Sequence, residues 1–236
     1  MIRLLKISIL LFFLFNYLSS FSQGRYNDYK DNYVFSFLSK KYSSTYGISL
    51  FPYDNTKNFG ICMNLISQEY QTINGLNVEL IGNGIVDIFS SDNDYSRTNF
   101  QTKITSTYNG ISISPLGLNS NGIVNGLSIN GIHCYQTQIK GIGISFLVIN
   151  TMFLNGLSLS CFSKFGLMKG LQVGIIVRSN ESKGVSIGCF SGSDNGHGLI
   201  IGLFNSSLKH KGLMLGLINE VEGKFFPIIY FNFKDK

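Results

Sequence analysis

Basic side chains recur at one place in the second half of the sequence, directly before a glycine that opens an apolar phrase. They are Lys140, Lys169, Lys183, His197 and Lys211. If the phrases stack on one another, these side chains form a basic rim that would attract lipopolysaccharide phosphates, acidic glycans or other polyanions. The alternative is a row of solubilising turn residues that opposes edge-to-edge pairing. Nucleic acid is not an expected partner, because no aromatic residues are interleaved with the basic ones.

Two histidines and a carboxylate lie close together in the sequence. His197 and His210 fall near equivalent turn positions of neighbouring phrases, and Asp194 is nearby. A protein metal site needs three or four converging ligands, so we expect exposed polar residues here and predict no metal site. His133, beside Cys134, is expected to be structural.

No catalytic centre is predicted. The chain has 13 acidic residues, and we find no nucleophile–base pair and no pair of carboxylates with catalytic spacing. The triplets "GNG" and "GIG" lack the strand–loop–helix context of a phosphate-binding loop. We therefore expect a protein that is not an enzyme and that needs no cofactor.

The glycines that open the phrases recur at a nearly constant period. The gaps between them are 15, 15, 14, 14, 14 and 14 residues, for Gly126, Gly141, Gly156, Gly170, Gly184, Gly198 and Gly212. Weaker copies begin at Gly75 and Gly110, and "YGISLF" from residue 46 resembles a further copy. A fixed period of this kind is the signature of a repeat architecture.

Within each phrase, apolar residues alternate with small ones. The first, third and fifth residues after the glycine are aliphatic or cysteine, as in Leu171, Val173 and Ile175. This period of two predicts one strand of about eight residues per repeat, with odd and even residues on opposite faces. The even face is lined by glycine or serine and ends in a large apolar residue, such as Phe190 or Phe204. About six turn-forming residues follow each strand.

Neither predicted face is a water-facing polar surface, and two all-β architectures satisfy that constraint. The first, which we favour slightly, is an antiparallel meander closed as a β-barrel in an outer membrane, with the odd face toward lipid. The second is a β-solenoid, in which each repeat is one coil and equivalent residues stack. A solenoid would close only if each strand bends, at the glycines 174, 188, 202 and 216. Asn205 and Asn219 would then share one slot and begin a side-chain ladder.

Cysteines number four: Cys62, Cys134, Cys161 and Cys189. Cys161 and Cys189 occupy the same slot two repeats apart, which is about 9.6 Å for neighbouring strands about 4.8 Å apart. A disulfide needs Cα atoms closer than about 7 Å. We therefore expect these two residues to be small apolar residues in the core or facing lipid, and not to be paired with each other.

The N-terminal segment has the pattern of a secretory signal peptide. Arg3 and Lys6 precede the apolar run "ISILLFFLFNYL", and Ser20 and Ser22 fit a cleavage site. Residues 1–22 would be removed, leaving a single β-repeat domain at 23–236. Its regular repeats span 125–219, its C-terminal strand spans 225–233, and the polar segment 90–103 is the expected surface loop. The expected location is the outer membrane or cell surface, with a secreted or periplasmic protein as the alternative.

The phrases "GLMLGLIN" at 212–219, "GLQVGIIV" at 170 and "GLIIGLFN" at 198 resemble a known repeat. They are similar to the G-[LV]-Q-I-G-L-[IV]-N units of the leptospiral-type, glycine-rich surface-repeat proteins of Gram-negative bacteria. The resemblance implies a cell-surface or outer-membrane location and no enzymatic activity. We expect a structural, adhesive or pore-like role, with outer-membrane lipid or a cell-surface glycan as partner. The alternative is a soluble secreted β-solenoid that binds a glycan, a polyanion or a protein.

Overall fold

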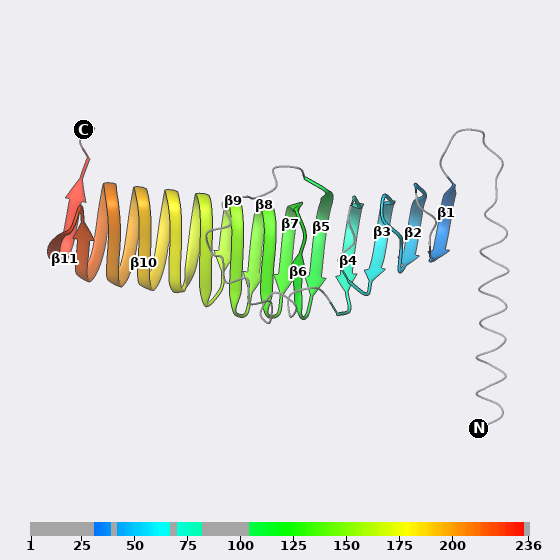
Figure 1. Cartoon of the computed structure of the whole chain (residues 1–236), viewed down its shortest axis with the longest axis horizontal. Coiled ribbons are helices and arrows are strands. Elements are labelled where there is room, and N and C mark those ends of the chain that lie inside the picture. Colours follow the sequence, from blue (N-terminus) through cyan, green and yellow to red (C-terminus); the bar gives the residue numbers. More distant parts are fainter. Residues whose placement is uncertain (1–30, 39–41, 67–69, 82–103, 234–236) are drawn as a thin grey trace, which may run out of the picture.

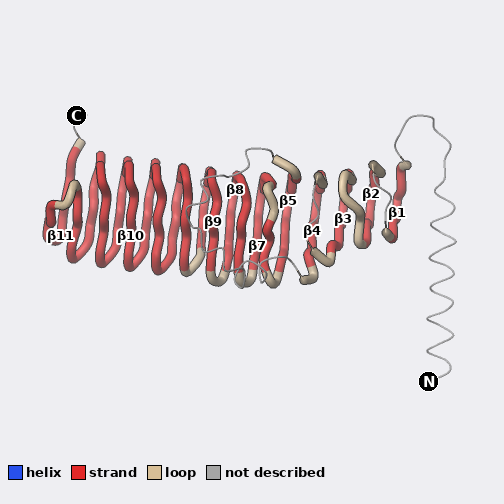
Figure 2. The backbone as a smooth tube through the Cα atoms, viewed as in Figure 1, coloured by secondary structure: helices blue, strands red, loops and turns tan. Residues whose placement is uncertain are grey.

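The computed structural model describes residues 31–38, 42–66, 70–81 and 104–233, which coil into a long stack of strands (Figure 1). The strands are β1 (Asn32–Phe37), β2 (Ser44–Leu50), β3 (Lys57–Asn64), β4 (Thr72–Glu79), β5 (Ser106–Ser114), β6 (Gly117–Asn119), β7 (Gly122–Asn130), β8 (His133–Ser145), β9 (Val148–Leu159), β10 (Phe162–Val221) and β11 (Lys224–Asn232). No helix occurs among the described residues (Figure 2). The expected signal peptide and the polar segment 90–103 lie outside the described residues.

Neighbouring strands pair in parallel, and the opening glycine of one coil faces the opening glycine of the next. Gly47 pairs with Gly60, Gly60 with Gly75, and Gly75 with Gly110. The same register continues through Gly126, Gly141 and Gly156 to Gly170. The structure is therefore a β-solenoid. The antiparallel barrel that we favoured is wrong, because successive strands of a meander would pair in opposite directions.

Eleven opening glycines, from Gly47 to Gly212, form a column along the stack. Their φ angles lie between +119° and +143°, a region that side chains other than glycine rarely adopt. A Cβ atom on any of them from Gly60 onward would overlap the carbonyl oxygen of the preceding glycine in the column. The glycine period is thus a requirement of close coil stacking and of the bend at that point.

Positions are numbered here from the opening glycine of each coil, which is position 0. Positions +2 and +4 point inward, and positions +1 and +3 point outward, as the alternation predicts. The alternation changes phase at +5 and +6, which both point outward, and position +7 is again buried. The large residue at +6 is therefore outside, as in Phe190 (49 % exposed) and Phe204 (42 %). Our expectation that it lies on the inner face with the glycines is wrong, because the chain turns there.

The inner glycines at +4 allow that turn, as the solenoid alternative requires. A Cβ on Gly174 would overlap the carbonyl oxygen of Ser160, and one on Gly216 would lie 2.5 Å from the carbonyl oxygen of Gly202. The predicted separation into eight-residue strands and turns holds for β2–β5 and β7, with lengths of 7–9 residues, but not for β10. Extended structure runs without interruption through the 60 residues of β10, because the "turn" residues form the remaining sides of each coil.

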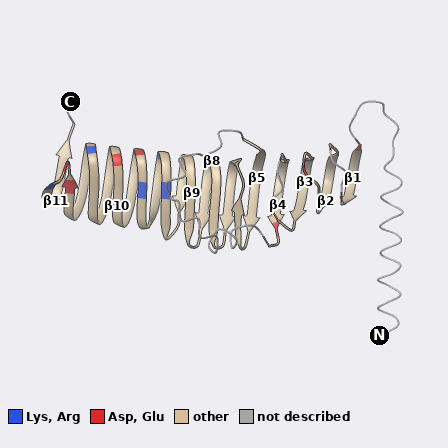
Figure 3. Cartoon of the chain, in the orientation of Figure 1, with Lys and Arg blue, Asp and Glu red and all other residues tan. Residues whose placement is uncertain are grey.

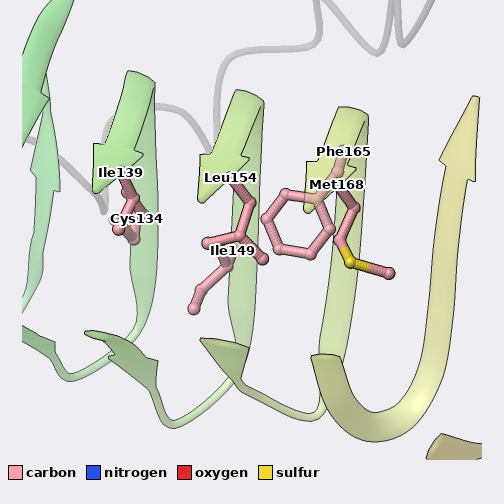
Figure 4. Close-up of a cluster of buried hydrophobic side chains, with 6 residues drawn as sticks. All are labelled: Cys134, Ile139, Ile149, Leu154, Phe165 and Met168. Atoms are coloured by element: carbon pink, nitrogen blue, oxygen red, sulfur yellow. The ribbon is translucent and has the colours of Figure 1, made fainter. Parts of the chain in front are cut away.

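The interior changes in character along the stack. Apolar clusters lie beside buried polar residues in β3–β7, around Tyr108 and Val124, and in β8–β10, around Ile149 and Phe165 (Figure 4). Further along β10 the buried residues are largely serine and asparagine, such as Ser179, Ser193 and Asn205. A third apolar cluster of Ile200, Met214 and Val221 lies near the C-terminal end, against Phe226 and Tyr230 of β11.

The C-terminal strand β11 covers the last coil of β10 in the one antiparallel pairing among the described strands. It corresponds to the strand predicted at 225–233. Its outer side carries exposed apolar residues, with Phe225 at 70 % and Phe231 at 70 % exposure. The stack thus ends in a strand that runs antiparallel to its neighbour, whereas the earlier strands pair in parallel.

Candidate functional site

The basic residues singled out in the sequence form one column, at position −1. The register places Lys140 next to Asn155 and Asn155 next to Lys169, and Lys183, His197 and Lys211 follow in the coils of β10. All of them are exposed except Lys211, which is half-buried. The predicted rim therefore exists as a row of side chains separated by about one strand spacing, roughly 4.8 Å, per coil. Figure 3 shows basic residues on several coils of β10 and acidic residues on others.

The same column is neutral in the first half of the stack. The side-chain amide of Asn125 donates to the Oδ1 of Asn109 at 2.7 Å, and that of Asn109 donates to the Oδ1 of Asn74 at 2.7 Å. This asparagine ladder was missed, because the copies that begin at Gly75 and Gly110 were too weak to be aligned with the regular repeats. The rim thus has a self-bonded neutral part and a basic part.

Acidic residues lie near the basic part but outside the column. Glu181 contacts Lys183, with 3.1 Å between the carboxylate Oε1 and Nζ. Asp194 lies 3.8 Å from the guanidinium of Arg178, on another side of the coil. The column itself contains no carboxylate in the described coils, although Glu181 offsets part of the charge of Lys183.

The histidines do not form a site. His197 is exposed on the rim, whereas His210 is 4 % exposed and points into the stack at position −2. Our expectation that His210 is an exposed turn residue is therefore wrong. Among the described residues no three His, Cys, Asp or Glu side chains converge to hold a metal ion. His210 instead occupies space left by Gly196, where a Cβ would overlap its imidazole ring.

A shallow groove runs across the last coils, next to the column of residues at position +6. It has a volume of about 470 Å³ and lies between Phe190, Phe204, Arg178 and Phe225. The rings of Phe190 and Phe204 are stacked, with centroids 5.3 Å apart and planes at 10°.

The outward side of positions +1, +3, +5 and +6, called here the aliphatic face, is the largest uniform surface. Position +1 is occupied by Ile48, Ile61, Leu76, Ile111, Leu127, Ile142, Leu157, Leu171, Val185, Leu199 and Leu213. Position +3 is equally apolar, from Leu50 in β2 to Leu215 in β10. None of the four positions carries a charged residue in any described coil. The rim at −1 runs along one edge of this face.

Among the described residues, Glu79 is the one buried carboxylate, and it lies within a polar network. Ser114 Oγ donates to its Oε2 at 3.3 Å, and the Asn77 amide donates to its Oε1 at 3.4 Å. Asn77 also donates to Ser112, and Asn64 donates to Asn77. These contacts join successive coils and lie inside the stack, away from solvent, so they serve to hold the coils together.

The cysteines are all reduced in this structure. Burial raises the pKa of the Cys62 and Cys134 thiols to about 12, which removes the thiolate that a nucleophile needs. Cys161 and Cys189 share position +5 on the aliphatic face, and Cys189 is exposed. They are not bonded to each other, in agreement with the spacing argument.

No family model, curated protein or solved structure matches this chain. The resemblance to the surface-repeat proteins therefore stays a prediction. The described residues also contain no helix long and apolar enough to cross a membrane.

Proposed function

We propose that the protein is an exported, non-enzymatic β-solenoid that binds anionic glycans or other polyanions at the cell surface through its basic rim. The observation that carries the proposal is the in-register stacking that aligns Lys169, Lys183, His197 and Lys211 in one column. A linear polyanion also presents charges at regular intervals, so several contacts form together on a rigid support. The pore-like role rested on the barrel and is not carried further.

Export and surface location are supported by the signal-peptide pattern at 1–22. The interior offers no reactive thiolate at Cys62 or Cys134, and Glu79 is enclosed by amides and hydroxyls. The most distinct features of the described surface are a column of cations, a shallow groove and the aliphatic face. Of these, the column of cations is the feature whose chemistry defines a class of binding partner, namely anions.

Fluorescent dextran sulfate tests the proposal. The purified protein should bind it with an affinity that falls as salt rises, because each lysine contact releases counterions. The triple variant Lys169→Gln, Lys183→Gln, Lys211→Gln should bind at least about tenfold more weakly.

A second triple variant, Lys57→Gln, Arg178→Gln, Lys224→Gln, serves as the control. It removes the same number of charges from exposed residues outside the column. If it loses as much affinity as the rim variant, binding reflects net charge and not the rim. If the unaltered protein does not bind, the proposed function is wrong.

A further inference from the structure

The aliphatic face is larger and more uniform than a soluble protein usually exposes. Eleven coils at about 4.8 Å each and five positions at about 3.3 Å each give a footprint of roughly 870 Å², before the residues at +6 are added. The largest apolar patch of a typical monomer is about 300–600 Å². At its +5 and +6 edge the side chains are well exposed, with Leu203 at 48 %, Leu217 at 63 % and Phe190 at 49 %.

The composition of the face distinguishes a lipid from a protein partner. A specific protein interface has a polar rim, about one hydrogen bond per 100–200 Å² and aromatic or arginine anchors at its centre. Positions +1 and +3 at the centre of this face contain only Ile, Leu, Val and Met in the described coils. Such a surface offers no directional contact, and hydrocarbon needs none.

The backbone hydrogen bonding beneath the aliphatic face also suits contact with an apolar medium. The strands of neighbouring coils pair in parallel from β1 to β10. The amide and carbonyl groups of the inner coils are therefore satisfied within the sheet, so contact with lipid leaves none of them without a partner.

The charge at the edge of the aliphatic face indicates the head-group charge of the lipid that would bind. The basic part of the rim, including Lys169 and Lys183, runs along position −1 beside the residues at +1. Long lysine side chains at the edge of an apolar surface reach the head groups while the apolar residues lie deeper. We propose that the aliphatic face is a lipid-binding surface, on which the solenoid lies flat in the interface of a membrane with anionic head groups.

A fluorophore on the face tests this directly. An environment-sensitive probe attached to the thiols of Cys161 and Cys189 reports from position +5, while Cys62 and Cys134 are fully buried and do not react. With vesicles of phosphatidylcholine and phosphatidylglycerol in equal amounts, its emission should shift to the blue. Vesicles of phosphatidylcholine alone should bind at least about tenfold more weakly. A probe at Asn180→Cys, in a chain with Cys161→Ser and Cys189→Ser, should shift little, because Asn180 is exposed outside the face.

A variant with polar residues on the face provides the second arm. Leu171→Thr, Val173→Thr, Val185→Thr and Ile187→Thr together keep β-forming residues at outward positions and should weaken vesicle binding at least about tenfold. Leu208→Thr with Phe153→Thr, which alters exposed apolar residues elsewhere, should leave binding unchanged. Continued protection of Cys62 and Cys134 from thiol reagents shows that each variant is folded.

Three results would overturn the proposal. A blue shift that grows with protein concentration in the absence of vesicles would show that a second copy covers the face. An equal shift at Cys189 and at Asn180→Cys, or equal binding of the threonine variant, would show that lipid contact does not use the face. The proposed polyanion binding is tested separately, because the threonine variant should still bind dextran sulfate.

Discussion

The side-chain amide of Asn205 donates a 2.8 Å hydrogen bond to the Oδ1 of Asn219, one coil further along β10. Both residues are at position +7, and both are buried, with exposures of 2 % and 0 %. The same amide nitrogen of Asn205 lies 2.9 Å from the carbonyl oxygen of Leu215, and the Asn219 amide donates to the carbonyl of Phe226 in β11. The pair therefore links two coils to the capping strand.

Replacing Asn205 with alanine should destabilise the C-terminal coils. The change leaves the buried Oδ1 of Asn219 without its donor, and an unsatisfied buried acceptor costs about 1–3 kcal/mol. Urea unfolding measures the loss. Asn205→Ala combined with Asn219→Ala should cost less than the sum of the single variants, because the second change removes the orphaned acceptor. Ser206→Ala, in the same coil but exposed, should have little effect, and additive losses would contradict the ladder.

Replacing an opening glycine with alanine should be far more harmful than replacing another glycine of the same coil. In Gly184→Ala the Cβ would overlap the carbonyl oxygen of Gly170, at a backbone φ of +143°. We expect a loss of about 3 kcal/mol or more, because strain and overlap add.

Gly192 provides the matched control for this substitution. A Cβ at Gly192 would have its nearest neighbours at 3.8 Å, which is ordinary contact, so Gly192→Ala should stay within about 1 kcal/mol of the unaltered protein. Thermal or urea unfolding of the two variants measures the difference. Equal losses would mean that the glycine column is not what sets the coil spacing.

The sequence alone was sufficient to predict the repeat and the division of positions +1 to +4 between two faces. A position that requires a positive φ can be recognised in the sequence, because glycine recurs there and other residues are disfavoured. The period of two likewise marks +1 and +3 as one face and +2 as the other. Gly60 was missed, because it lies 13 residues after Gly47 and 15 before Gly75 and is flanked by phrases with less regular polar segments.

The pairing direction could not be obtained in the same way. Alternation along a strand is identical in parallel and antiparallel sheets, so it did not separate the barrel from the solenoid. The distinction depends on the chain after position +4, where Phe190 and Phe204 turn outward. Our prediction carried the alternation straight through that point and so placed these residues inside. A pattern of straight strands does not predict that two consecutive residues point to the same side, as they do at this corner.

The candidate site shows the same division. The column of Lys169, Lys183 and Lys211 follows from the period alone and could be predicted. The separation of His197 from His210 could not, because one residue of offset at the rim moves a side chain from solvent to the interior. The neutral half of the column, with Asn74, Asn109 and Asn125, required the register of the weaker copies.

Thiol labelling should rank the cysteines by their place in the coil. Cys189 is exposed at +5, whereas Cys62 and Cys134 are fully buried with pKa values raised to about 12 by burial. A maleimide at neutral pH should therefore modify Cys189 first and Cys161 more slowly. In the folded protein, Cys62 and Cys134 should react at least about a hundredfold more slowly than Cys189, since the thiolate is the reactive form. They should react readily only after denaturation. Mass spectrometry of the modified peptides measures the order, and rapid labelling of Cys134 would contradict the coil register.

Lowering the pH below the ordinary histidine range should weaken the C-terminal coils through His210. Burial lowers the pKa of His210 below its ordinary value of 6.5, and neither ring nitrogen has a hydrogen-bond partner among the described residues. Below pH 6.5 the unfolded chain therefore binds a proton that the folded chain resists. Stability from this group is complete above pH 6.5 and is lost as the pH falls toward the folded pKa.

The His210→Met variant isolates that contribution. Methionine fits position −2, which Met168 occupies elsewhere in the stack, and it does not titrate. Urea midpoints at pH 7.5 and at about 5.5, above the range where most carboxylates titrate, should fall less in this variant than in the unaltered protein. If His210→Met and the unaltered protein lose the same stability over this range, the buried imidazole is not the source of the acid sensitivity.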